Sequence, residues 1–324
     1  MFISVIVYVR NTEKYLRKCL DSIASQDFDD YEAIIVDDAS TDASGRICDE
    51  FINSIGDASG KKGKFKFIRM EKSDPSAAKN RGLEEACGDW IWFIDSFDFL
   101  APGALAAIKE RMRMAIGEMY SFQYIKVDEN GENPEEVIQR TNQEVVRIKN
   151  DGDLRWQYSD RLFMFKDSWE LWSRLFSGNI IRENVIRFPD YQTVLSHELG
   201  FLMDYMMFVS RSVMLMNFLL NVRQCDRTEP EASGQSSAIP GTVTLLEAVY
   251  RKAKRFGKKL LLRDFNIVVL YAFRNQIEQK LDELSDDEIC RQITEAAGNK
   301  TIGKIIRKTK KQLIAAARAD RIRK

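Results

Sequence analysis

The stretch SDPSAAKNRGLEEACGDWIWFIDSFDFL, residues 73–100, decides the fold. It predicts a polar loop, a short helix over roughly 76–86, and then an apolar strand over 90–94 that runs directly into the turn DSFD. In open parallel sheets ligands bind just beyond the carboxyl ends of the strands, so Asp95 and Asp98 of this turn are placed to meet a ligand. Paired carboxylates supply the oxygen ligands that Mg²⁺ or Mn²⁺ prefers.

The composition is that of an ordinary globular chain with enough apolar residues for a large core. Of 324 residues, 44% are hydrophobic and 30% are charged, and the 49 basic residues balance the 49 acidic ones. The overall charge therefore favours no particular partner, and we expect no nucleic-acid binding. The five cysteines are scattered without a CxxC pair, which is typical of reduced thiols. We see no signal peptide and no apolar run long enough to cross a bilayer, so we expect a cytoplasmic protein.

The single histidine, His197, limits the chemistry. A multi-histidine zinc site is excluded, and no cysteine cluster replaces it. No GxSxG motif is present for a serine nucleophile. The remaining chemistry is that of carboxylates.

The N-terminal part of the chain alternates strands and helices. Apolar, β-branched runs predict strands over 2–9, 33–36 and 65–69, and helical periodicity lies between them. Asn11 is expected to cap the first helix. This βαβαβ order predicts a doubly wound α/β sheet with right-handed crossovers.

Three strands of this sheet end in polar residues at the same rim. These residues are Arg10 and Asn11 after the first strand, Asp37 and Asp38 after the second, and Asp95 and Asp98 after the fourth. An aspartate at a strand end is often only a turn former or a helix cap. Three such clusters at one rim favour a ligand site instead.

Three segments resemble the sequence pattern of the family 2 glycosyltransferases of bacterial polysaccharide type. The family pattern has PxYN, then VDDGSTD, then ARNxGLxxAxGxYIxFLDSDD, and this chain has ISVIVYVRN, AIIVDDASTDAS and AAKNRGLEEACGDWIWFIDSFD in the same order. The resemblance covers about the first 100 residues well and continues weakly to about residue 225. It implies an α/β GT-A domain over 1–225, with a nucleotide-binding half (1–115) and an acceptor half (116–225). A mobile linker (226–241) and a helical C-terminal region (242–324) would follow.

The resemblance also implies roles for individual residues. Asp38 would hydrogen-bond the nucleotide base, Lys79 would lie near the base and phosphates, and Asp95 and Asp98 would hold the ribose and a Mn²⁺ or Mg²⁺ ion on the diphosphate. The implied donor-binding residues are Tyr8, Arg10, Asn11, Asp37, Asp38, Lys79, Asp95 and Ser96. The ion would neutralise charge on the departing diphosphate.

The chain departs from this pattern at three places. Phe97 stands at the third position of DSDD, which weakens the expectation of a metal. Arg10 adds a cation that pairs with phosphate, or simply with Asp37 or Asp38. Where the family has Glu-Asp before LGF, this chain has His197 and Glu198.

The second of these two residues is the expected catalytic base. Glu198 would take the proton of the acceptor hydroxyl, and His197 is either the alternative base or its orienting partner. The competing interpretation is an acidic residue that merely favours the start of a helix.

The last segment, 302–323, is a basic amphipathic helix. It fits the surface of an anionic membrane, or packing against its own domain.

Together with these features, the resemblance implies an inverting, metal-assisted glycosyltransferase. It would move a sugar from a nucleotide-sugar, above all a UDP-sugar, to a glycan or lipid-linked glycan, in the cytoplasm or on the inner face of the membrane. The alternative is a non-catalytic, nucleotide-binding or scaffolding relative in a glycan assembly complex. A nucleotidyltransferase is a third possibility, against which the missing Gly-rich phosphate loop counts.

Overall fold

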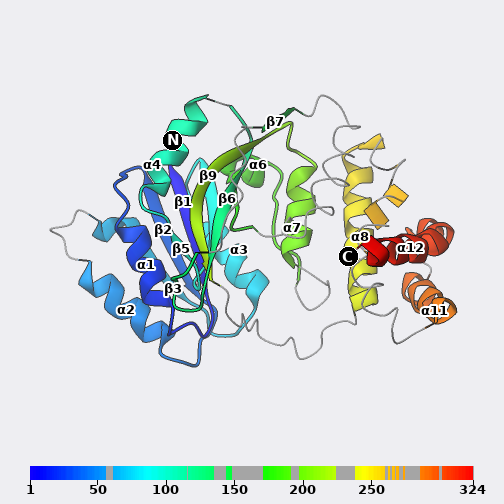
Figure 1. Ribbon diagram of the computed structural model, residues 1–324, viewed down its shortest axis with the longest axis horizontal. Coiled ribbons are helices and arrows are strands. Elements are labelled where there is room, and N and C mark those ends of the chain that lie inside the picture. The colour runs from blue at the N-terminus through cyan, green and yellow to red at the C-terminus, as the bar shows by residue number, and fades with distance from the viewer. Residues whose placement is uncertain are drawn as a thin grey trace. The chain divides into compact units, whose positions relative to one another are not determined.

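The computed structural model describes most of the chain (Figure 1). The described residues are 1–55, 61–114, 116–134, 144–147, 171–190, 197–223, 238–259, 262, 265–266, 268–269, 273, 285–298 and 301–323. Their packing separates two compact units. Unit 1 takes the described residues within Met1–Arg147, Glu170–Arg187 and Val209–Glu231, and unit 2 takes those within Phe188–Phe208 and Ala232–Lys324.

Unit 1 is built on one mixed sheet. In the described part of the chain its strands are β1 (Ile3–Val9), β2 (Tyr31–Asp37), β3 (Phe65–Arg69), β4 (Trp90–Asp95), β5 (Phe99–Leu100), β6 (Met119–Val127), β7 (Glu144–Arg147), β8 (Arg174–Ser177) and β9 (Arg211–Arg223). The order is β3-β2-β1-β4-β8-β6-β9-β5, with β7 beside β9. Strands β1 to β4 are parallel, as the βαβαβ pattern predicts.

The direction of β6 and β9 brings two further strand ends to the same rim. β8 runs antiparallel to both of its neighbours, β4 and β6, and β9 runs parallel to β6. β6 and β9 therefore point the same way as β1 to β4. Their carboxyl ends share the rim that carries the polar strand ends.

Helices cover both faces of the parallel strands: α1 (Leu16–Ala24), α2 (Ser44–Ser54), α3 (Pro75–Glu85) and α4 (Ala104–Met114). Figure 1 shows α1 and α2 on one side of the strands and α3 on the other. Side chains of a strand alternate between faces, so Val5, Val7 and Val9 join the core of α1, α2 and α4. Ile6 faces α3, which lies so near that a Cβ on Gly82 would come 2.6 Å from the Ile6 Cγ2. The glycine of the RGL motif thus allows the helix to approach the strand.

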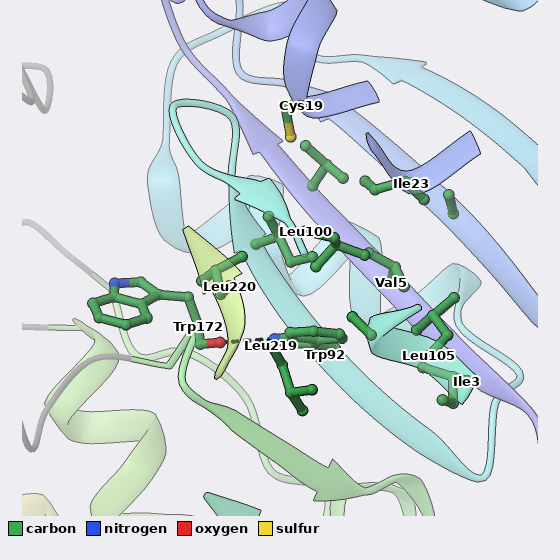
Figure 2. Packing of buried hydrophobic residues seen from close by; sticks show 14 of the residues in the cluster. Ile3, Val5, Cys19, Ile23, Trp92, Leu100, Leu105, Trp172, Leu219 and Leu220 are labelled. Atoms are coloured by element: carbon green, nitrogen blue, oxygen red, sulfur yellow. Dashed lines mark hydrogen bonds between the residues drawn. The ribbon is translucent and has the colours of Figure 1, made fainter. Parts of the chain in front are cut away.

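Two tryptophans join the middle of the sheet to its antiparallel part. Trp92 on β4 is fully buried and its Nε1 donates a hydrogen bond of 2.7 Å to the carbonyl of Trp172, just before β8 (Figure 2). Its ring meets that of Phe122 on β6 edge-on, with centroids 4.9 Å apart. The Trp92 ring thus buries a large apolar area, while the Trp172 carbonyl satisfies its indole N–H.

The predicted elements agree closely with the observed ones, with one exception. The strand over 65–69 is confirmed, and the helix over 76–86 and the strand over 90–94 are confirmed to within one residue. The prediction that Asn11 caps the first helix was wrong. α1 begins only at Leu16, and the Asn11 Oδ1 instead accepts the backbone N–H of Thr41 at 2.8 Å. Asn11 has a φ of 49°, a conformation that asparagine tolerates better than most residues, and this turns the chain toward the β2–α2 loop.

Unit 2 is helical in its described residues. Its helices are α7 (His197–Met206), α8 (Ala238–Arg255), α11 (Asp286–Ala297) and α12 (Gly303–Arg323). The buried Glu247 of α8 accepts the backbone N–H of Ile302 at 3.0 Å and so holds the start of α12. The predicted linker 226–241 and domain boundaries remain predictions, since 224–237 lie outside the described residues. None of the described helices has both the length and the apolar character that crossing a membrane requires.

Candidate functional site

The register of the parallel strands sorts the rim residues onto two faces. Tyr8 pairs with Asp95, and Val9 pairs with Asp37. Paired residues on neighbouring parallel strands project to the same side, so Tyr8 and Asp95 lie on the face of α3. Asp37 lies with Val9 on the face of α1 and α2.

Asp38 ties three segments together at this rim. Its carboxylate is fully buried. Oδ2 accepts the Tyr8 hydroxyl at 2.8 Å and the Ser73 hydroxyl at 3.1 Å, while Oδ1 accepts the backbone N–H of Asp74 at 2.6 Å. These bonds use most of the acceptor capacity of a carboxylate. Asp38 thereby fixes the ends of β1 and β2 to the loop that begins α3.

Lys79 brings a positive charge next to Tyr8. It is 3% exposed, and its Nζ lies 4.9 Å from the centroid of the Tyr8 ring. A cation over an aromatic face is stabilised by the ring quadrupole. Lys79 lies on α3, and the start of this helix is capped. The Asp74 Oδ1 accepts the N–H of Ala77 at 2.8 Å, and Pro75 follows the cap. Tyr8 therefore stands between Asp38 and Lys79.

Arg10 lies at the end of β1 and turns toward β2. Its Nη1 donates to the carbonyl oxygens of Asp38 and Ala39. The sequence left phosphate, or Asp37 or Asp38, as its expected partner, and within the described residues Arg10 forms no ion pair. Asp37 pairs instead with Arg69, at 3.4 Å from Nε to Oδ2, and its Oδ1 accepts the N–H of Ser40.

The DSFD turn is closed by a hydrogen bond from the N–H of Asp98 to the carbonyl of Asp95, and the N–H of Ser96 donates to the Tyr8 carbonyl. Asp95 is half-buried, whereas Asp98 has no exposed surface. The Asp98 Oδ1 accepts the backbone N–H of Arg223 at 3.0 Å.

Arg223 contacts this turn from β9, and the sequence analysis did not identify it. Its Nη1 donates to the Phe97 carbonyl at 2.6 Å, and its guanidinium lies over the rings of Tyr15 and Phe99, at 5.2 Å and 4.9 Å. Arg223 ends β9, and no motif in the sequence marks it. Only the pairing of β9 within the sheet shows that it reaches the turn.

The expected divalent ion does not fit this turn well. Phe97 offers no ligand, Asp98 is enclosed with its Oδ1 hydrogen-bonded to β9, and the Arg223 guanidinium donates to the Phe97 carbonyl. Mg²⁺ keeps several of its bound waters, so a carboxylate can bind it only where the hydrated ion can reach that carboxylate. Among the described residues no group of three His, Cys, Asp or Glu side chains is arranged to hold a metal.

Two thiols lie beneath the rim and contribute no nucleophile. Cys19 and Cys48 are fully buried. Burial raises the pKa of the Cys19 thiol and raises the pKa of Cys48 to about 12. Both are therefore neutral thiols at neutral pH, which are poor nucleophiles.

His197 and Glu198 begin α7 in unit 2. His197 is buried, with its ring 5.9 Å from that of Phe188, and Glu198 is half-buried in the first helical turn. An acidic residue here also favours the helix start. Their catalytic roles remain predictions.

Comparison with known proteins agrees with the motifs. The family model "Glycosyl transferase family 2" matches residues 4–214, more than half of the chain. GlyA, a glycosyltransferase of Streptococcus pneumoniae, is 39% identical over 125 residues, which are 37% of this chain and 17% of that protein. EpsH of Bacillus subtilis, a putative glycosyltransferase, is 30% identical over 193 residues, 58% of this chain and 50% of that protein. The matched regions thus span half or less of these two relatives.

The fold also matches a solved structure. Residues 1–349 of Staphylococcus aureus TarS, in complex with UDP-GlcNAc, superpose with a TM-score of 0.68 at 21% identity, covering 98% of this chain and 88% of that one. The α/β GT-A fold expected from the sequence is confirmed by this likeness and by the family match.

Proposed function

Because the chain belongs to glycosyltransferase family 2, we propose that it transfers a sugar from a nucleotide-sugar to an acceptor hydroxyl. The observation that carries this proposal is the wall formed by Tyr8, Asp38 and Lys79 on the face of the rim that also carries Asp95. Ligands of open α/β sheets bind at such rims. UDP is the proposed nucleotide, since TarS, which shares the fold, has been solved with UDP-GlcNAc.

The proposed reaction is a single displacement that inverts the anomeric carbon. The acceptor oxygen forms a bond to that carbon while the bond to the diphosphate oxygen breaks, and the bonding electrons leave with the diphosphate. Glu198 takes the acceptor proton, and His197 orients Glu198 or replaces it as base. Asp95 and Ser96 hold the ribose, and Lys79 and Arg10 place positive charge where the diphosphate becomes more negative. No step is assigned to the divalent ion, whose expected ligands fit it poorly.

The proposed acceptor is a glycan or lipid-linked glycan. Supporting this is the basic face of α12, where Lys304, Arg307, Lys308 and Lys311 are exposed. A basic amphipathic helix is attracted to anionic lipid headgroups, so contact of 302–323 with a membrane surface belongs to the same proposal.

Calorimetric titration with UDP tests the proposal. We expect UDP to bind, and Asp95→Asn to weaken it about tenfold or more, because a charged acceptor of ribose hydroxyls is lost. Asp21→Asn is the matched control, since Asp21 lies exposed on α1 in an ion pair with Arg17. A chain that binds neither UDP, GDP nor dTDP would refute a nucleotide-sugar donor.

A non-catalytic, nucleotide-binding relative is the second candidate. Phe97 in place of an acidic residue and the enclosure of Asp98 are the observations that favour it. Release of free sugar from UDP-sugars separates the two candidates, because an enzyme hydrolyses its donor slowly without acceptor whereas a binding protein leaves it intact.

A further inference from the structure

Two departures from the family pattern change the charge of the donor site in the same sense. Phe97 stands where DSDD has the second of its three acidic residues, so one negative charge is missing. Arg10 stands where PxYN has its tyrosine, so one positive charge is added. Both changes make the rim less suited to a metal cation and better suited to an anion.

Contacts within the protein take up part of the turn that would hold a metal. Asp98 has no exposed surface, and its Oδ1 accepts the Arg223 N–H at 3.0 Å. The Arg223 side chain donates to the adjacent Phe97 carbonyl at 2.6 Å, which places a fixed positive charge within the turn. A second cation beside it would be repelled. Asp95 is the one carboxylate of the turn with exposed surface, and a single exposed carboxylate leaves a divalent ion weakly held.

Arg10, in contrast to the DSFD turn, is suited to an anion rather than to a cation. Its Nη1 is bonded to two neutral carbonyls, those of Asp38 and Ala39, and Arg10 forms no ion pair with a carboxylate of the described residues. Its Nε is buried without a hydrogen-bond partner in the described part of the chain. A guanidinium carries five N–H donors in a fork that matches phosphate oxygens. With Nη1 bonded and Nε buried, Nη2 is the nitrogen of Arg10 left for an anion.

The position of Arg10 suits a diphosphate. Arg10 directly follows β1 (Ile3–Val9), and Tyr8, two residues earlier, pairs with Asp95. The Arg10 side chain reaches the carbonyls of Asp38 and Ala39 at the end of β2, so it lies at the rim next to Asp38 of the Tyr8–Asp38–Lys79 wall. A nucleotide whose base and ribose contact this wall presents its phosphates to the same rim.

We infer that this site binds its nucleoside diphosphate without a divalent ion, and that Arg10 supplies the cation on the diphosphate. This inference rests on the proposed function. An aspartate with a divalent ion adds a net charge of one positive unit, and Phe97 with Arg10 adds the same. A guanidinium held by backbone carbonyls is preorganised, so it stabilises the negative charge on the departing diphosphate without reorganisation.

The test begins with wild-type protein and UDP, titrated calorimetrically in EDTA and then in Mn²⁺. We expect the same affinity in both. Arg10→Gln should weaken UDP binding about tenfold or more, and Arg10→Lys should weaken it less, since the charge is kept and the fork is lost. Uridine, followed by ligand-observed NMR, should bind Arg10→Gln as it binds the wild type, because it carries no phosphate. Arg46→Gln is the control, since Arg46 is exposed on α2 and paired with Glu50.

Phe97→Asp gives the converse experiment. Restoring the acidic residue should create a metal requirement, so that Mn²⁺ raises the affinity of this variant for UDP above its value in EDTA. A variant indifferent to Mn²⁺ would contradict the role given to Phe97.

Three further outcomes would overturn the inference in distinguishable ways. Wild-type binding that is lost in EDTA and restored by Mn²⁺ would refute metal independence and leave the proposed function intact. Equal loss of UDP and uridine binding in Arg10→Gln would assign Arg10 to packing of the rim. Absence of binding by UDP, GDP and dTDP would remove the proposed function itself. The EDTA comparison uses the wild type, so it holds even if an Arg10 variant does not fold.

Discussion

Ala39 is a residue whose backbone is strained at the rim. It follows Asp37 and Asp38 with a φ of 52°, in the left-handed region, and the family pattern VDDGSTD has glycine there. A residue with a Cβ pays about 1–2 kcal/mol in this conformation. Its carbonyl accepts Arg10, so the strained turn is also what aims that oxygen at the guanidinium.

Ala39→Gly should therefore stabilise the protein. We expect the free energy of unfolding to rise by about 0.5–1 kcal/mol, since the strain relieved exceeds the entropy that glycine adds to the unfolded chain. Urea denaturation measures it. Ala106→Gly is the matched control: Ala106 is exposed within α4, and the change should cost about 0.5–1 kcal/mol there. A loss at position 39 equal to that at 106 would show that the turn is unstrained.

At the scale of elements, α3 is the piece that carries the site. It positions Lys79 against Tyr8, approaches β1 through Gly82, and begins at a loop bonded to Asp38. Its hydrophobic contacts set its place on the sheet, and its cap sets where the first turn starts. The cap is therefore the part that can be weakened without removing a side chain of the proposed donor wall.

Asp74→Ala should reduce the stability of this helix. Loss of the bond from the Ala77 N–H to the Asp74 carboxylate is expected to cost about 1 kcal/mol in the free energy of unfolding. Asp74→Asn keeps an acceptor oxygen and should cost only part of that. Faster hydrogen exchange at the Ala77 amide in Asp74→Ala, and not in Asp74→Asn, checks the assignment. Identical exchange in both variants would mean that the side chain does not cap α3.

For the whole molecule, the two units differ in architecture. Unit 1 has one sheet with helices on both faces of its parallel strands. Unit 2 is helical in its described residues and combines buried apolar side chains, such as Leu246 and Ile306, with buried polar contacts. Glu247 is one of these contacts. It is 6% exposed, and its two oxygens accept the Ile302 N–H at 3.0 Å and the Arg251 Nε at 2.8 Å.

Glu247→Ala should loosen unit 2 selectively. A buried donor left without its acceptor costs about 1–3 kcal/mol, so amides at the start of α12 should exchange faster while those of β1 and β4 are unchanged. Glu247→Gln retains an acceptor oxygen and should fall between this variant and the wild type. Uniform acceleration across both units would indicate that the chain unfolds as a single cooperative body.

The local pattern of apolar and polar residues predicted many of the strands and helices and most of the residues at the rim. The strand over 65–69, the helix that carries Lys79 and the strand that ends in Asp95 depend on side-chain periodicity, which neighbouring residues determine. The motifs also identified the family, because their order and spacing are properties of the chain. The Asn11 prediction failed since a cap depends on where the helix begins, and the bond to Thr41 spans 30 residues.

Only the tertiary structure decided how these groups are used. β8 enters the sheet antiparallel between β4 and β6, and β9 brings Arg223 to Asp98 across 125 residues. The same packing directs Arg10 to carbonyls rather than to a carboxylate. Such partners are chosen by strand pairing between distant segments and by the burial of charge that follows from it. For that reason the sequence determined which residues reach the rim, while the fold determined which carboxylate is enclosed and which partners Arg10 and Arg223 contact.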